Sequence, residues 1–139
     1  MLKKSSKKYL FIALIFCCSH FVFAENYKYQ RAEIFYMKWD ILTRTRQTIE
    51  DVRLRYSVKT VIVDKGEVNK FLMWLQINEM QCAKVKMQED ARVVIDFYED
   101  SNHRVTYYVS LFNLISEDGM TYRNIDLDFR NKFTFGGAW

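Results

Sequence analysis

The alternation of apolar and polar residues between positions 93 and 111 constrains the fold of this chain more than any other feature. Val93, Ile95 and Phe97 stand at every second position, and the same period resumes after the polar run 99–102. Because successive side chains of a strand point to opposite faces, two such runs around a short polar turn predict an antiparallel hairpin. Its second strand has an apolar side with Val105, Tyr107, Val109 and Leu111, and a polar and aromatic side with Arg104, Thr106, Tyr108 and Ser110.

A second pattern predicts the main helix, which begins after Asp64. The side chain of Asp64 can cap the helix, and Glu67 stands at the third helical position. Apolar residues then fall at i, i+3, i+4 and i+7, as on one face of an amphipathic helix: Val68, Phe71, Leu72 and Leu75. Met73, Trp74 and Ile77 widen this stripe, and we interpret the added width as further core.

Three more strands and a short helix are expected on either side of these elements. The strands cover 32–39, 57–63 and 120–124, and the last of them follows a turn that ends at Gly119. Thr48 and the acidic residue three positions later match a capping pair. A short helix should follow, with Ile49, Val52 and Tyr56 on its buried side.

A last short helix is predicted near the end of the chain. Asp126 or Asp128 would cap it, and Phe129 and Phe133 would lie on it. All elements together predict an α+β fold: an antiparallel sheet of about four to five strands, with one main amphipathic helix packed on one face and one or two short helices.

The first 24 residues have the layout of an export signal. Four lysines precede an apolar run over 9–18, a polar break follows at Ser19 and His20, and Ala24 closes the segment. We predict a secretory signal peptide over 1–24 that is cleaved before Glu25, which leaves 25–139 as a single compact domain. An uncleaved anchor is the alternative, but the apolar run has about half the length that a membrane-spanning helix needs.

Removal of that segment changes the charge of the chain. The segment contains four of the 21 basic residues and none of the 17 acidic ones, which leaves 17 of each. A net charge of zero removes the electrostatic argument for nucleic acid or an anionic membrane as partner. We therefore expect no nucleic-acid partner and no stable membrane anchor after cleavage. The predicted location is the periplasm or the exterior, with a bacterial envelope favoured by the short lysine-rich signal.

One cysteine remains in the mature chain. Cys17 and Cys18 leave with the signal, so Cys82 has no intramolecular partner for a disulfide. We expect the Cys82 thiol to be buried, because an unpaired cysteine behaves as a small hydrophobic residue. Pairing between two chains is the alternative in an oxidising compartment.

Groups that could carry catalysis are few. His103 is the only histidine of the mature chain, which excludes a zinc site with several histidines and leaves Cys82 and His103 as the only nucleophile–base pair of that kind. The four glycines form no phosphate-binding loop, and Asp126-Leu127-Asp128 lacks the glycine and the glutamate of a calcium loop. We predict no catalytic residue, no metal and no cofactor.

This profile favours binding over catalysis. We predict a small exported, non-enzymatic module that binds another envelope protein. Its most concrete form is an inhibitor or immunity protein that blocks an envelope-directed toxin or enzyme by steric occlusion. Tyrosines would supply rigid contact area, and acidic turns would steer a cationic partner. The candidate contact residues are Tyr98, Glu99, Asp100, Tyr107, Tyr108, Glu117 and Asp118.

Three alternatives stay open at this point. The tyrosines can instead complete the packing of the sheet, while the acids only keep the turns soluble. A small-ligand binder would need a pocket between the main helix and the sheet. An envelope hydrolase would need Cys82, or a carboxylate such as Asp96, in a cleft.

Overall fold

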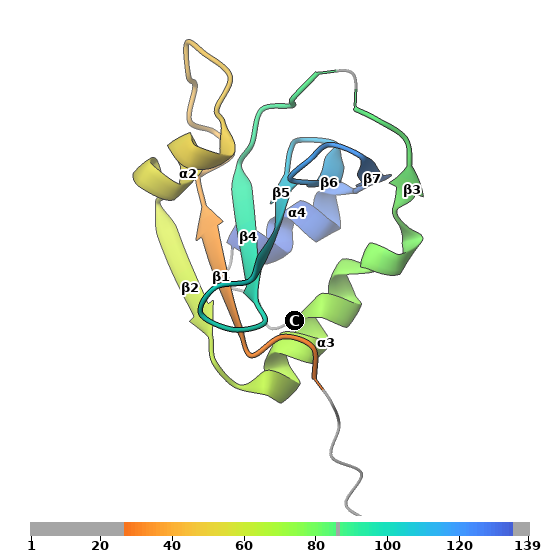
Figure 1. Cartoon of the computed structure of the whole chain (residues 1–139). Helices are drawn as coiled ribbons and strands as arrows, with labels where there is room; N and C mark the ends of the chain where they lie inside the picture. The colour runs from red at the N-terminus through yellow and green to blue at the C-terminus, as the bar shows by residue number, and fades with distance from the viewer. Residues whose placement is uncertain (1–26, 86, 135–139) are drawn as a thin grey trace, which may run out of the picture.

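The computed structural model describes residues 27–85 and 87–134, so the predicted signal peptide lies outside the described residues. The described chain forms the α+β fold that the sequence predicts, around one antiparallel sheet (Figure 1). The sheet has seven strands, more than the four to five expected. Their bounds are β1 Arg31–Tyr36, β2 Val58–Ile62, β3 Gln81–Cys82, β4 Val93–Tyr98, β5 Arg104–Val109, β6 Asn113–Ser116 and β7 Thr121–Asn124.

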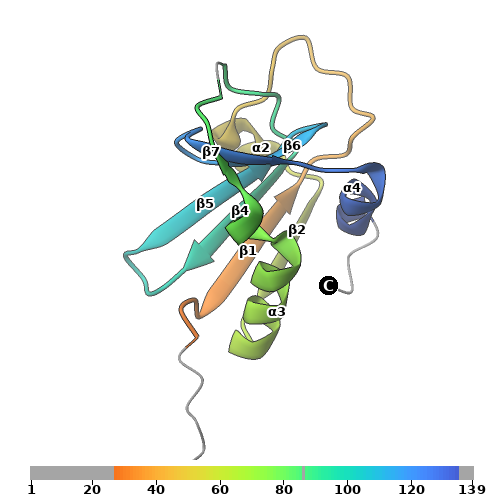
Figure 2. The ribbon, with the colours of Figure 1, turned by 90° about the vertical axis from the view of Figure 1, so that its right-hand side faces the viewer.

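The strand order is β2-β1-β4-β5-β6-β7-β3. Strands β4 to β7 follow one another as a meander, and β1 pairs with β4 so that Ile34 lies opposite Ile95. In an antiparallel meander, alternate turns lie at the same end of the strands. The β4–β5 and β6–β7 turns therefore point the same way, but β6 is short, and its turn lies beside Thr106 in the middle of β5, close to helix α2, Ile49–Arg55 (Figure 2). The opposite end of the strands holds residues 37–48, 87–92 and 110–112, which we call the loop end.

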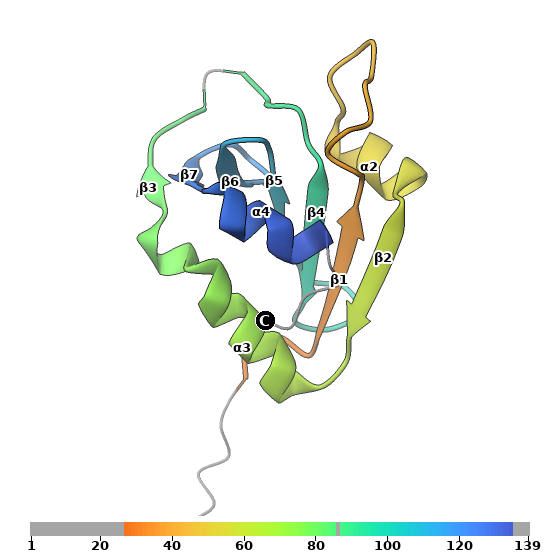
Figure 3. The same ribbon diagram turned by 180° about the vertical axis from the view of Figure 1, so that it is seen from behind.

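Helices cover both faces of the sheet, as Figure 3 shows from behind. Helix α3 (Lys65–Leu75) and helix α4 (Leu127–Thr134) lie on one face, and helix α2 (Ile49–Arg55) lies on the other. A single 3-10 turn, η2 (Ile77–Glu79), follows α3. The predicted caps are present, because Asp64 accepts a hydrogen bond from the Glu67 amide and Thr48 forms a capping box with Asp51.

The core on the α3 and α4 face is the larger of the two. Phe71 and Leu75 of α3 are fully buried against Ile95 and Phe97 of β4 and other strand residues. Trp74 of α3 stacks on Phe129 of α4 with ring centroids 4.5 Å apart, so the wide apolar stripe of α3 is covered partly by the second helix. Met73, at the edge of that stripe, stays exposed.

Besides Met73, which was interpreted as further core, Tyr56 and Leu111 are exposed although the sequence placed them on buried faces. Tyr56 is 43% exposed because α2 ends at Arg55 and Tyr56 already follows its last turn. Leu111 is also exposed, because β5 ends at Val109 and the chain turns at Ser110 instead of continuing to Leu111. Strand β1 likewise ends at Tyr36, three residues before the predicted end.

Candidate functional site

The β4–β5 turn contains the first predicted acidic pair, Glu99 and Asp100. The carboxylate of Asp100 accepts hydrogen bonds from the amides of Asn102 (2.7 Å) and His103 (2.9 Å), and from the His103 ring. These donors, the Asn102 amide first, lower the pKa of Asp100 below its ordinary value. Glu99 lies 3.4 Å from Lys28 Nζ. Asp100 thus remains ionised while it holds the turn.

The second acidic pair, Glu117 and Asp118, lies in the β6–β7 turn. Asp118 accepts hydrogen bonds from Ser116 Oγ (2.6 Å) and the Met120 amide (2.9 Å), and these bonds lower its pKa. Gly119 has a φ of 69°, a left-handed conformation that glycine adopts without strain. Glu117 is exposed, and within the described residues no ion pair involves it.

The two acidic turns flank the first half of β5, because one precedes Arg104 and the other lies beside Thr106. Arg104 and a pocket of about 400 Å³ lie between them, and the pocket is lined by β5 residues and by Ser116, Glu117 and Asp118. Tyr107 lines this pocket and is half-buried, and burial raises the pKa of its hydroxyl. The pocket can accept a side chain of a partner beside two negative turns.

The three predicted contact tyrosines do not share one face. Tyr98 points to the α2 face, where the Arg31 guanidinium lies 4.3 Å from its ring centroid. Tyr107 belongs to the opposite face and packs against Phe97. Tyr108 is 2% exposed in the core under α2, so it has almost no surface to offer to a partner.

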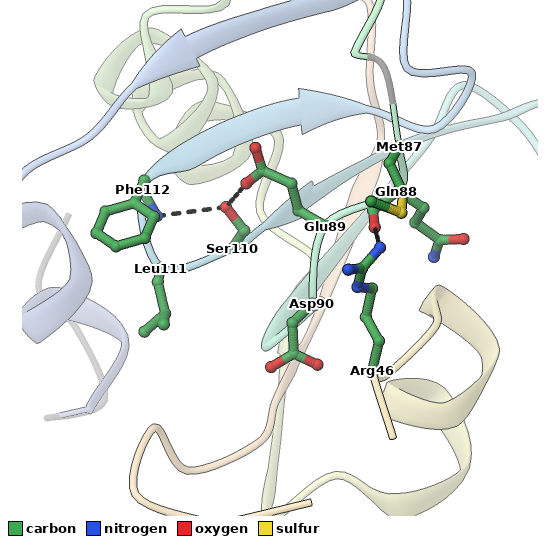
Figure 4. A pocket seen from close by; sticks show the side chains of 8 residues that line it. All are labelled: Arg46, Met87, Gln88, Glu89, Asp90, Ser110, Leu111 and Phe112. Atoms are coloured by element: carbon green, nitrogen blue, oxygen red, sulfur yellow. Dashed lines mark hydrogen bonds between the residues drawn. The ribbon is translucent and has the colours of Figure 1, made fainter. Parts of the chain in front are cut away.

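A second pocket, which sequence reasoning missed, lies at the loop end (Figure 4). It has a volume of about 340 Å³, and its walls are more apolar than polar. Exposed Met87, Leu111 and Phe112 line it together with Arg46 and the chain around Glu89. No short motif marks this pocket, because its walls come from three loops that are distant in the sequence.

Hydrogen bonds tie these three loops to one another. Glu89 accepts hydrogen bonds from Ser110 Oγ and from Asn113 Nδ2 (2.7 Å), which joins the loop before β4 to the β5–β6 turn. Asp90 accepts from the Gln47 amide (2.6 Å), and Arg46 donates to the Gln88 carbonyl (2.7 Å). The charged and polar groups of the loop end thus bond to one another, and its apolar side chains face the solvent.

The buried carboxylate of Asp96 has a complete set of partners. Arg53 of α2 donates two hydrogen bonds to it (3.1 and 2.7 Å), and Thr106 Oγ1 donates a third (2.6 Å). Asp96 is 1% exposed and lies under α2, so a substrate cannot reach it in this conformation. The arrangement attaches α2 to the sheet.

The prediction that Cys82 is buried is wrong. Cys82 is exposed, because β3 is a two-residue strand at the edge of the sheet with a neighbour, β7, on one side only. His103 lies in the exposed β4–β5 turn. Strand β3 lies three strands beyond β5, a separation of about 14 Å at the usual strand spacing. The structure therefore does not bring Cys82 and His103 together.

Among residues 27–85 and 87–134, no group of three or more His, Cys, Asp or Glu side chains is arranged to hold a metal ion. In the same residues, no helix has the length and apolarity needed to cross a membrane. Comparisons with protein-family models, with curated proteins and with solved structures found no match.

Proposed function

We propose that this protein is a small exported module that binds another envelope protein and acts by steric occlusion, as an inhibitor or immunity protein does. The observation that carries the proposal is the arrangement of the two acidic turns on either side of Arg104 and the pocket that Tyr107 lines. Asp100 and Asp118 keep their charge because turn hydrogen bonds lower their pKa. A cationic partner would be steered toward these turns and would place a side chain between them.

The contact surface in this proposal differs from the full predicted set. Tyr107, Glu99, Asp100, Glu117 and Asp118 remain as its members, because they lie before or beside residues 104–107 of β5, a region that we call the acidic end. Tyr98 lies on the other face of the sheet, at the rim of this end, and Tyr108 contributes to the core.

The test is affinity purification of the tagged protein from the native envelope fraction at low and moderate salt. The variant Glu99→Lys/Glu117→Lys reverses the charges of half-buried Glu99 and exposed Glu117 without removing the carboxylates of Asp100 and Asp118 that hold the turns. Glu79→Lys/Asp128→Lys, with two exposed acids outside the acidic turns, is the matched control. We expect one stoichiometric protein to stay bound to the wild type and the control, to leave as salt rises, and to be lost with the first variant.

Two outcomes would contradict the proposal. If the Glu99→Lys/Glu117→Lys variant retains the same protein with the same salt dependence, the acidic end is not the contact surface. If a folded wild type retains nothing, the inhibitor function itself is wrong. A bound target also allows a direct assay, in which a stoichiometric amount of this protein should abolish the target's activity.

A second candidate function is the binding of a small ligand. A groove of about 570 Å³ lies between α3 and the β7–α4 region. Its lining includes the aromatic Trp74 and Phe129, the cations Arg123 and Lys132, and the acids Asp126 and Asp128. The Arg123 side chain is partly buried, and this desolvation lowers its pKa. The space between α3 and the sheet, where the sequence argument looked for a pocket, is occupied by buried core side chains. Binding of an anionic naphthalene dye that is lost in Arg123→Gln would favour this candidate.

A further inference from the structure

Exposed apolar side chains gather at the loop end. Leu42 is 99% exposed, and Phe112 and Met87 are 69% and 63% exposed. Ile41 and Leu111 are exposed as well. Single exposed apolar residues are common on protein surfaces, but five of them on three neighbouring loops form a patch of the kind that marks an interaction site.

The charge that the loop end presents is positive, although the predicted mature chain is neutral. Lys38, Arg44 and Arg46 are exposed and are opposed in the same loop only by Asp40. None of these four side chains takes part in an ion pair within the described chain.

The neighbouring loop 87–92 adds two acids and one cation, and its Asp90 pairs with Arg92. Glu89 is bound by Ser110 and Asn113, and Asp90 is bound by Gln47 and Arg92. The β4–β5 turn with its acidic pair lies at the far end of β5. Exposed Glu50, Glu117 and Asp118 line a pocket with Thr48 and Gln88 at the base of the loop end. The excess of positive charge is therefore confined to the loop 37–48, which rises above α2 (Figure 1).

We infer that the loop end docks on an anionic lipid bilayer. Leu42 and Phe112 enter the boundary between headgroups and acyl chains, and Arg44 and Arg46 contact lipid phosphates. This occupant fits for two reasons: the exposed cations complement an anionic surface, and a bilayer boundary accepts separate apolar tips that rise from different loops. The acidic β4–β5 turn is repelled by the same surface, which orients the molecule with that turn pointing away from the lipid.

The loops are ordered before they meet the membrane. Ala91 and Gln47 are joined by a backbone hydrogen bond (3.0 Å), and Arg92 donates to the Ile41 carbonyl (2.8 Å). Together with the bonds of Glu89 and Asp90, these contacts fix the direction of the tips. Little ordering entropy is then lost on docking, so a small apolar area is sufficient for reversible binding.

Vesicle binding tests the inference with the full chain. The probes are phosphatidylcholine vesicles with and without phosphatidylglycerol, and co-sedimentation gives the partition coefficient. We expect partition to need phosphatidylglycerol and to fall as salt rises. Leu42→Ser should lower the partition coefficient about tenfold, because its side chain no longer enters the boundary. Arg44→Glu should lower it about tenfold as well.

Matched controls lie away from the loop end. Val63→Ser removes an exposed apolar side chain between β2 and α3, and Lys65→Glu reverses an exposed charge at the start of α3. Both control variants should have partition coefficients within about twofold of the wild-type value. Because all variants share the same N-terminal segment, its contribution to binding is common to them. The inference is overturned if the Leu42 and Arg44 variants partition like the controls.

A fluorescent label gives an independent readout of which end touches lipid. With the native cysteines replaced by serine, an environment-sensitive dye is attached at Leu42→Cys or, as a control, at Ser101→Cys in the β4–β5 turn. Vesicles should shift the emission of the dye at position 42 to the blue and leave that at position 101 unchanged. An unshifted dye at position 42 would overturn the lipid docking and leave the loop end as a protein-contact surface. Neither result depends on the partner proposed for the acidic end.

Discussion

Arg53 and Asp96 form a charge pair whose two members are both largely removed from water. The side chain of Arg53 is 11% exposed and that of Asp96 is 1% exposed. A pair of this kind adds little net stability, because the attraction between the two charges is largely cancelled by the cost of removing both from water. The loss of one member is much more harmful, since it leaves the other charge buried without a partner.

We therefore expect Arg53→Met to lower the free energy of unfolding by about 3 kcal/mol. Urea denaturation measures the change. The double variant Arg53→Met/Asp96→Asn should regain part of the loss, because it leaves no buried charge behind. Arg55→Met, on the exposed side of the same helix, should change the stability by less than about 0.5 kcal/mol. Equal losses in Arg53→Met and Arg55→Met would contradict a buried pair.

The second residue-scale prediction concerns His103. Its side-chain hydrogen bond with Asp100 raises its pKa above the ordinary value. A raised pKa in the folded state means that the interaction stabilises the fold fully below the unfolded pKa, and that this contribution is lost as pH rises through the folded pKa. The lowered pKa of Asp100 has the reverse effect, because its stabilising contribution is lost as pH falls through the folded value.

NMR titration of the His103 ring protons measures this shift directly. We expect the pKa of His103 in the wild type to lie above that of a histidine in an unfolded peptide. In Asp100→Asn it should move toward the peptide value, because the charged partner is gone. A His103 pKa that does not respond to Asp100→Asn would show that the pair does not persist in solution.

At the scale of elements, helices were easier to predict than strands. The caps Thr48 and Asp64 and the 3.6-residue period are local signals, and α2 and α3 begin where these signals placed them. Strand β6 was missed because the turn before it has no glycine, proline or aspartate. Ser110 makes that turn instead, since its hydroxyl accepts hydrogen bonds from the amides of Phe112 (3.3 Å) and Asn113 (3.1 Å). The apolar Leu111 in this turn continued the alternating pattern of β5, so it was predicted as part of that strand.

The end of α3 gives an element-scale prediction. Its C-cap residue, Gln76, has a φ of 52°, a left-handed conformation that is unfavourable for residues with a Cβ atom. Gln76→Gly should raise the free energy of unfolding by about 0.5 kcal/mol, because glycine adopts this conformation without strain. Lys70→Gly, inside the same helix, should lower it by about 1 kcal/mol. Thermal denaturation of both variants checks whether their free energies of unfolding change in opposite directions from that of the wild type.

On the scale of the whole molecule, the two-sided core follows from the position of β4. This strand pairs with β1 and β5, and five of its six residues are buried. The alternating pattern of this hairpin indicated one apolar face, and α2 covers the other, polar and aromatic face, on which Tyr98 and Tyr108 were expected to contact a partner. The prediction that Tyr108 on that face contacts a partner therefore failed, because α2 buries this face through a tertiary contact that no local sequence pattern reveals.

The same arrangement predicts a gradient of hydrogen exchange. Amides of β4 should exchange most slowly, since both neighbours of this strand bond to it and helices cover both of its faces. Amides of β2 and of the two-residue β3, which are the edges of the sheet, should exchange fastest among the strands. Exchange measured by mass spectrometry on peptides checks this order. Faster exchange in β4 than in β2 would contradict it.

Strand β5 joins the acidic β4–β5 turn to the loop end and is six residues long. Six residues of strand span about 20 Å. If the loop end rests on a bilayer, β5 acts as a rigid spacer that sets the height at which a partner is met. Targets whose exposed cationic site lies at about that height above the lipid are within reach, and targets with sites much closer to the surface or much farther from it are not. The length of one strand would in this way select partners by their geometry.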